Sequence, residues 1–176
     1  MSAAALVIDE ILSSYRPDLG KEFGTYRNHV CRVYHNCRVI DPTPANEMKY
    51  ALAAVLHDIG IWTDRTFDYI KPSIARARAY LGQSHPESDF AEIASMITWH
   101  HKLSPYAGEH ALTTESFRKA DWIDVTRGLL TFGYSRSEFV DAVGRYPLLG
   151  FHRFLLRQSI RNTLRHPLNP LPMFRW

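Results

Sequence analysis

The sequence predicts an all-α protein in which residues 1–176 form a single domain, a helical bundle of six to eight helices. Apolar residues recur at steps of three and four along most of the chain, which is the period of a helix that buries one face. No segment of useful length alternates apolar and polar residues as a half-buried strand does. A chain of 176 residues that is 45% hydrophobic and 22% charged has the size and composition of one globular domain.

The spacing of apolar residues, together with proline and glycine at helix ends, predicts where each helix begins and ends along the chain. Residues 3–15 place apolar side chains on one broad face, and Pro17 is expected to end that helix. Residues 21–40 carry apolar residues at alternating steps of four and three. Residues 45–58 are rich in alanine, and Gly60 after them is expected to cap the helix C-terminus. The remaining helices are expected at residues 72–81, 87–101, 111–130, 137–146 and 149–165.

The C-terminal part of the chain, residues 137–176, is expected to pack on a core formed by about residues 22–130. Within residues 149–165, four arginines repeat at every fourth position, and the apolar residues between them predict a helix packed on the body. We expect these arginines to face solvent or to pair with acidic residues, and a nucleic-acid surface is less favoured. A contact between subunits of a homo-oligomer is the remaining alternative. Residues 166–176 combine three prolines with apolar side chains, which predicts an extended segment near polyproline II that lies in a preformed groove.

The composition argues against a secreted or membrane protein. The longest apolar run, residues 51–56, is far shorter than the roughly 20 residues that a membrane-spanning helix needs. The N-terminal segment has no basic region and contains Asp9 and Glu10, unlike a signal peptide. We therefore expect a cytoplasmic protein with no membrane partner.

Histidines and carboxylates on inward helix faces form the main functional signal. His29 lies on an apolar face, His57 and Asp58 end an apolar helix, and Asp121 shares a face with Asp124. A carboxylate that faces a core must be paired or must bind a cation. Helix bundles commonly build metal sites from side chains on facing helices. Two imidazoles and two carboxylates converging from three helices would satisfy this requirement with one divalent ion.

These residues, in the order in which they occur along the chain, resemble the motifs of the HD-domain superfamily of metal-dependent phosphohydrolases. The matching stretches are H-x-x-R-V at residues 29–33, L-H-D-I-G at residues 56–60 and A-D at residues 120–121. Residues 93–101, with their terminal His-His pair, also resemble the family's following helix. The resemblance spans about residues 22–130 and implies the helical fold of that superfamily.

The resemblance implies a metal centre and a hydrolytic reaction. Its metal ligands would be His29, His57, Asp58 and Asp121. Two nitrogen and two oxygen ligands suit one divalent ion, Mn²⁺, Fe²⁺, Co²⁺, Ni²⁺, Mg²⁺ or Zn²⁺, rather than a structural thiolate zinc site. Such an ion lowers the pKa of a bound water and makes it a nucleophile. The expected activity is hydrolysis of a small phosphate ester or anhydride.

Three residues are candidates for catalysis beside the metal. Asp58 belongs to the expected ligand set, and His100 ends a helix on the face that points toward the expected site. Many members of the family carry an acid a few residues after the His-Asp pair, whereas here the chain reads Ile-Gly-Ile-Trp. Asp64 comes later and either acts as the general acid or base or caps the following turn.

Three further residues are expected to contact a small anionic substrate. Arg32 lies one turn after His29 and is interpreted either as a substrate contact or as an ion pair that orients an acid of the site. His101 and Lys102 follow His100 directly. Together these side chains indicate a weakly basic pocket.

Three alternatives remain at this point. A hydratase acting on a nitrile-like substrate, or a di-iron oxygenase, could use the same scaffold, and a non-enzymatic metal-binding module is the third. The oxygenases of this superfamily carry extra histidines on the two helices after the His-Asp pair. Here Ser73 lies where one is expected, and His85 lies in a loop. The sequence therefore predicts one metal ion per chain.

Overall fold

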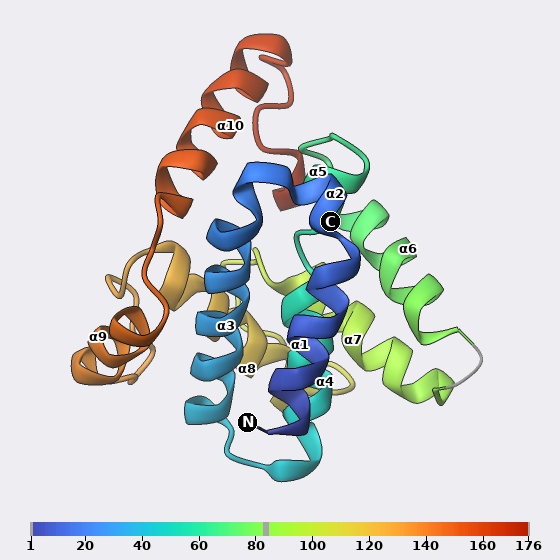
Figure 1. The fold of residues 1–176 in the computed structure, drawn as a ribbon, viewed down its shortest axis with the longest axis vertical. Coiled ribbons are helices and arrows are strands. Elements are labelled where there is room, and N and C mark those ends of the chain that lie inside the picture. Colours follow the sequence, from blue (N-terminus) through green and yellow to red (C-terminus); the bar gives the residue numbers. More distant parts are fainter. Residues whose placement is uncertain (1, 83–84, 176) are drawn as a thin grey trace.

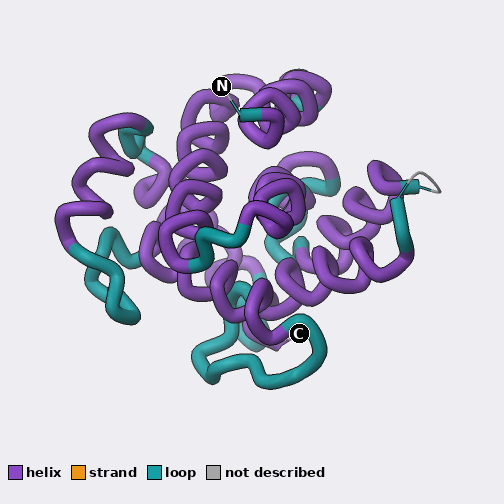
Figure 2. Tube along the Cα trace, turned by 90° about the horizontal axis from the view of Figure 1, so that it is seen from below, coloured by secondary structure: helices purple, strands orange, loops and turns teal. Residues whose placement is uncertain are grey.

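The computed structural model describes residues 2–82 and 85–175. Within these residues all regular structure is helical and no strand occurs (Figures 1 and 2), which confirms the all-α class. Helices of ten or more residues are α1 (Ala3–Ser14), α3 (Phe23–Ile40), α4 (Glu47–Leu56), α6 (Ile70–Leu81), α7 (Glu87–Trp99), α8 (Ala111–Val125), α9 (Arg136–Arg145) and α10 (Phe151–Arg165). Two four-residue helices, α2 (Arg16–Leu19) and α5 (Gly60–Thr63), and short 3₁₀ turns connect them.

The core forms around α3 and α4. Helix α3 packs mainly against α8 and α4, and α4 also packs against α1, α7 and α6. Every residue of α4 from Tyr50 to Leu56 is buried, so this helix has no solvent face over that stretch. An apolar sequence on all sides is what such a helix requires. Helix α4 therefore carries the residues directly after it, His57 and Asp58, into the interior.

Gly60 does not cap the preceding helix, contrary to the sequence prediction, because that helix ends at Leu56 and Gly60 begins α5. Close packing explains the glycine instead. A Cβ atom at this position would lie 2.8 Å from the carbonyl oxygen of Tyr69 and 2.9 Å from Cβ of Pro72. Only glycine lets the chain after Asp58 approach the start of α6 so closely.

The helix before Pro17 ends at Ser14, within one residue of the predicted end, and Pro17 itself lies in the first turn of α2, where a missing backbone N–H is not needed. One other predicted helix end differs from the structure. The helix expected over residues 111–130 ends at Val125, because Arg127 and Gly128 adopt positive φ angles of 57° and 73°. Thr126 satisfies the end of α8 by donating its backbone N–H to the carbonyl of Trp122.

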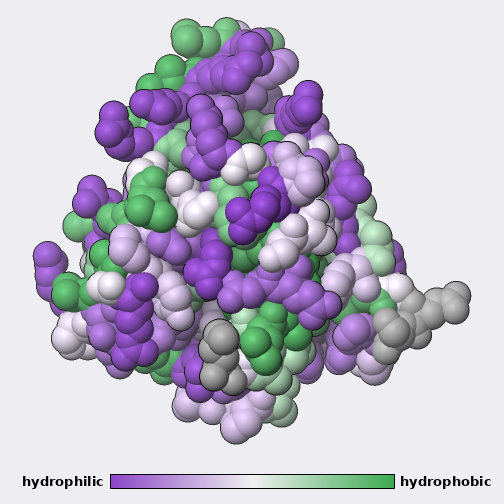
Figure 3. Space-filling model, in the orientation of Figure 1, coloured by the Kyte–Doolittle hydropathy of each residue, from purple (hydrophilic) through white to green (hydrophobic). Residues whose placement is uncertain are grey.

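The apolar side of α10 is less buried than the sequence predicts. Leu156, Ile160 and Leu164 are 62%, 52% and 79% exposed, and Phe151 is the fully buried residue of the helix. Figure 1 shows α10 rising away from the body, and Figure 3 shows hydrophobic and hydrophilic residues side by side at that end of the molecule. The helix contacts the body through the buried Phe151 at its start and through Phe154, whose ring stacks on Trp62.

The tail returns from α10 toward α5 and α6. The sequence predicts an extended tail, but the tail is not extended throughout, because Pro172–Arg175 forms the 3₁₀ turn η3. Pro172 and Met173 are buried, and Met173 packs with Ile61, Tyr69 and Ile70. Trp176, which belongs to the segment expected to lie in a groove, is outside the described residues. Among the described helices, none has the length and apolar character to cross a bilayer.

Candidate metal centre

Four buried side chains from three helical segments converge at one point. They are His29 on α3, His57 and Asp58 after α4, and Asp121 on α8. The Nε2 atoms of His29 and His57 lie 3.1 Å apart. Oδ1 of Asp121 lies 3.6 Å from Nε2 of His29, and Oδ2 of Asp58 lies 3.4 Å from Nε2 of His57. The structure thus brings together the four ligands expected from the sequence.

The far side of each imidazole is fixed by an acceptor. Nδ1 of His29 lies 2.7 Å from Oδ2 of Asp124, and Nδ1 of His57 lies 2.8 Å from the carbonyl oxygen of Ala54. Because an acceptor beside Nδ1 favours the proton on that atom, Nε2 of each neutral ring keeps its lone pair. Both lone pairs face the same point. This is the tautomer that a metal-binding histidine needs.

Several buried polar atoms at this point have no hydrogen-bond partner within the described part of the chain. They are Oδ1 of Asp58, Oδ1 of Asp121 and Nε2 of His100. Unpaired buried oxygens are costly, and a cation is the simplest group that would satisfy two carboxylates and two imidazoles together. The donor set of nitrogens and oxygens suits a divalent ion of the first transition series. The residues present therefore fit a metal ion.

The charges of the cluster are strongly coupled. Burial lowers the pKa of His57, but Asp58 and Asp121 outweigh it and raise that pKa to about 9. Burial raises the pKa of Asp58, but His57 and His100 outweigh it and hold that pKa well below its usual range. Burial raises the pKa of Asp121. With no cation present, a proton on His57 would supply positive charge beside these carboxylates.

Arg32 pairs with Asp124, the residue that contacts Nδ1 of His29, and it does not line the cavity beside the cluster. It is fully buried, and its guanidinium donates to both carboxylate oxygens of Asp124 at 2.6 and 2.9 Å. It also donates to the carbonyl oxygens of Tyr146 and Pro147 at 2.8 and 3.2 Å. Burial raises the pKa of Asp124, but His29 and Arg32 lower it to about 2. Of the two interpretations of Arg32, the structure shows the ion pair that orients an acid.

His100 and His101 lie on the other side of Asp58. Nε2 of His100 is 3.5 Å from Oδ1 of Asp58, and Nδ1 of His100 is 2.6 Å from the carbonyl oxygen of Ile97. His101 receives a short contact from the hydroxyl of Tyr69. Burial lowers the pKa of His101 well below its usual range, and His100 adds to this effect. Asp58, His100 and His101 form a second cluster whose geometry could hold an ion.

Four other residues singled out in the sequence lie away from this point. Asp64 is exposed and pairs with Arg76 at 3.1 Å, so it is not brought to the centre as a general acid or base. Lys102 points to the tail, with Nζ 3.4 Å from the carbonyl oxygen of Phe174. Ser73 and His85 also have contacts outside the cluster. Ser73 accepts a hydrogen bond from the backbone N–H of Gly60, and Nδ1 of His85 lies 3.3 Å from the carbonyl oxygen of Leu81.

A cavity of about 190 Å³ adjoins the cluster. Asp58, Asp121 and His101 form its polar wall near the cluster. Ser159 and a set of aromatic and aliphatic side chains from the connection between α5 and α6, from α8, from α10 and from the tail form the rest. The aromatic members Tyr69, Trp122 and Phe174 could not be predicted as site residues, because nothing in their local sequence pattern distinguishes them from ordinary core residues. Neither Arg32 nor Lys102 lines this cavity.

Comparisons of the chain with protein-family models, with curated proteins and with solved structures found no match.

Proposed function

We propose that the protein is a divalent-metal-dependent hydrolase whose centre is formed by His29, His57, Asp58 and Asp121. One observation carries this proposal: two imidazole Nε2 atoms face each other at 3.1 Å beside two buried carboxylates with unpaired oxygens. Without a positive charge between them these groups repel one another. The quoted motifs that resemble HD-domain phosphohydrolases support the same assignment.

A divalent ion bound there would lower the pKa of a water molecule and polarise the bond that it attacks. The chain's own residues then have separate tasks. Asp124 and the carbonyl of Ala54 hold the two imidazoles in the binding tautomer. His100 presents an unpaired Nε2 beside Asp58 and would accept a proton at that atom. The apolar walls of the cavity exclude bulk water from the reacting groups.

The lining of the cavity favours a small uncharged substrate. Its charged members are Asp58 and Asp121, and no lysine or arginine lies among the described residues that line it. An anionic phosphate would therefore depend on the metal ion alone for positive charge, because no cationic side chain lies in the cavity to bind it. Hydrolysis or hydration of a small neutral group such as an amide or a nitrile fits this lining. A phosphate ester is the second candidate, supported by the sequence resemblance.

Steady-state assays with added Mn²⁺, Co²⁺, Ni²⁺ or Zn²⁺ test the proposal. Acetamide, propionitrile and cyanamide represent neutral substrates, and para-nitrophenyl phosphate represents phosphate esters. Turnover of a neutral substrate should fall about 100-fold or more in His100→Gln, the range expected for loss of a proton acceptor, with bound metal unchanged. His35→Gln, a half-buried histidine outside the centre, serves as the control. Faster turnover of the phosphate ester would reverse the order of the two candidates, and no turnover on either panel would contradict the enzyme assignment.

A further inference from the structure

A second and larger cavity opens on the other side of Phe67, between α10 and the connection from α5 to α6. Its volume is about 450 Å³, within the usual range of small-molecule sites, which is roughly 300–1,000 Å³. Phe67 lines both this groove and the cavity beside the metal centre. Arg65, Arg161, Arg165 and His166 line the groove against a single carboxylate, that of Asp18. The cationic side chains missing from the metal cavity gather here instead.

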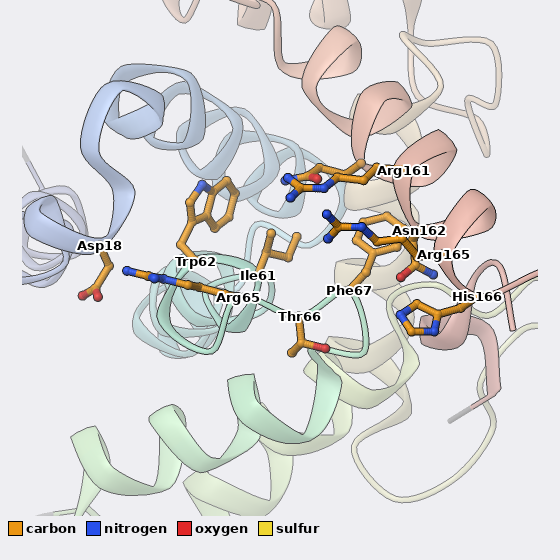
Figure 4. A pocket seen from close by; sticks show the side chains of 11 residues that line it. Asp18, Ile61, Trp62, Arg65, Thr66, Phe67, Arg161, Asn162, Arg165 and His166 are labelled. Atoms are coloured by element: carbon orange, nitrogen blue, oxygen red, sulfur yellow. The ribbon is translucent and has the colours of Figure 1, made fainter.

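The three arginines are free to bind a ligand. Among residues 2–82 and 85–175, none of them forms an ion pair, whereas Arg76 on the neighbouring helix is paired with Asp64. Figure 4 shows Arg161 and Arg165 reaching from α10 across the groove toward Trp62, with Arg65 directed toward Asp18. Guanidinium groups held side by side in this way bind phosphate or carboxylate groups through paired hydrogen bonds.

The groove also offers polar groups of other kinds. The indole Nε1 of Trp62 is buried and has no hydrogen-bond partner in the described part of the chain. The side-chain amide of Asn162 donates to the carbonyl oxygens of Asn169 and Pro170, which holds the start of the tail against this wall. The wall that carries Arg161 and Arg165 is therefore anchored, although both arginines are exposed.

The structure divides the arginine repeat of α10 into two halves. Arg161 and Arg165 line the groove, and Arg153 and Arg157 do not. A step of four residues turns about 40° around a helix, so Arg153 lies about 120° away from Arg165. The two halves carry the same charge on the same helix. They therefore provide a matched pair for an experiment.

From these observations we infer that the groove is a binding site for a small polyanion that carries phosphate or carboxylate groups. The ligand is di- or trianionic, because three arginines and one carboxylate surround the space. The site is separate from the metal centre and does not depend on the function proposed for it. Its ligand would be a distinct small molecule or the anionic part of a larger one.

Isothermal titration of inorganic pyrophosphate into the full chain at fixed ionic strength tests this inference. Saturable binding with a Kd below 1 mM is expected. The double variant Arg161→Gln/Arg165→Gln should weaken binding about 10-fold or more, and Arg153→Gln/Arg157→Gln less than about threefold. Citrate in place of pyrophosphate distinguishes carboxylate from phosphate recognition. Equal weakening by the two double variants would show a diffuse charge effect and overturn the inference, as would the absence of saturable binding for both anions.

The variant Asp58→Asn separates this site from the metal centre, since pyrophosphate also binds metal ions. Unchanged affinity in Asp58→Asn is expected if the groove is the site. Loss of binding in Asp58→Asn, with binding retained in Arg161→Gln/Arg165→Gln, would place the anion at the metal centre and contradict the groove. Such a result would leave the metal-dependent function intact, so the two proposals fail on different outcomes.

Discussion

The carboxylate of Asp124 accepts the Nδ1 proton of His29 at 2.7 Å, although the two residues are 95 positions apart. The same carboxylate accepts two hydrogen bonds from Arg32, which lies one turn after His29 on α3. All three side chains are fully buried. Asp124 thereby fixes the orientation of one proposed metal ligand and neutralises the arginine beside it.

Replacing Asp124 with Asn should weaken metal binding and also lower the stability of the fold. The amide keeps the shape but no longer holds His29 in one tautomer, and loss of such a partner typically lowers metal affinity 10- to 100-fold. Because Arg32 would remain buried without its counter-charge, the free energy of unfolding should fall by about 3–5 kcal/mol. Metal titration and urea unfolding measure the two effects. Unchanged metal affinity in a destabilised variant would leave Asp124 with a structural role alone.

Removing the metal should lower the thermal stability of the wild-type protein. An ion present at about 1,000 times its Kd stabilises the folded state by roughly 4 kcal/mol, because it binds the native cluster alone. A chelator should therefore lower Tm, and Mn²⁺ or Zn²⁺ should restore it. His57→Ala should bind little metal and show no response to chelator. An identical Tm for wild type with and without chelator would contradict a metal centre at His57.

Elemental analysis of protein purified without chelator should give one ion per chain. The second cluster, Asp58, His100 and His101, is less suited to a metal, because the hydroxyl of Tyr69 already contacts Nε2 of His101. Tyr69→Phe removes that contact and provides the comparison. Two ions in the wild type would reverse the prediction and favour the di-iron alternative.

Local sequence patterns could single out the four proposed ligands because these residues lie on three recognisable segments. His29 follows the helix period, and His57 and Asp58 end a helix that is apolar on all sides. The shared face of Asp121 and Asp124 also indicated that one or both needed a partner. All four residues are buried. They come together once the three segments that carry them pack against one another.

Pairings between distant residues could not be predicted in the same way. Arg32 and Asp124 are 92 positions apart, so the sequence left open whether the arginine meets a substrate or an acid. The same limit applies to α10, whose apolar residues predicted a buried face that packing does not supply. Helix periodicity shows which side chains share a face, but not whether another element covers that face.

Asp41 should contribute stability that is lost in acid. It is 5% exposed and accepts hydrogen bonds from Thr43, Asn46 and Tyr50. Burial raises its pKa, but these hydrogen bonds outweigh that effect and lower it. Since the folded pKa lies below the unfolded value of about 3.9, the contribution is present above that pH and is lost as the pH falls through the folded pKa.

Asp41→Asn should therefore reduce the free energy of unfolding by about 1–3 kcal/mol at pH 7, because it removes an anionic acceptor from three donors. Between pH 5 and pH 2 the variant should lose less further stability than the wild type. Urea unfolding across this range measures the difference. The exposed Glu10→Gln is the control, and parallel pH curves for wild type and Asp41→Asn would contradict the assignment.

The contact of the tail with the body should depend far more on Met173 than on the exposed Leu168. Met173 is 5% exposed and packs with Ile61, Tyr69 and Ile70, whereas Leu168 is 100% exposed. Truncating a buried methionine removes its transfer free energy and leaves a cavity, which costs about 2–5 kcal/mol. Met173→Ala should lower the free energy of unfolding by an amount in this range. Leu168→Ala should change it by less than about 0.5 kcal/mol.

Met173 also lines the cavity beside the metal centre, so the variant reports on more than stability. Metal content should be unchanged in Met173→Ala, because Met173 is outside the set of metal ligands, and the enlarged cavity should admit bulkier neutral compounds. Thermal shifts with acetamide and with the larger benzamide measure this change in the metal-loaded protein. Equal losses of stability in Met173→Ala and Leu168→Ala would show that the tail does not dock as described, and an unchanged preference for acetamide would show that Met173 does not limit the size of the cavity.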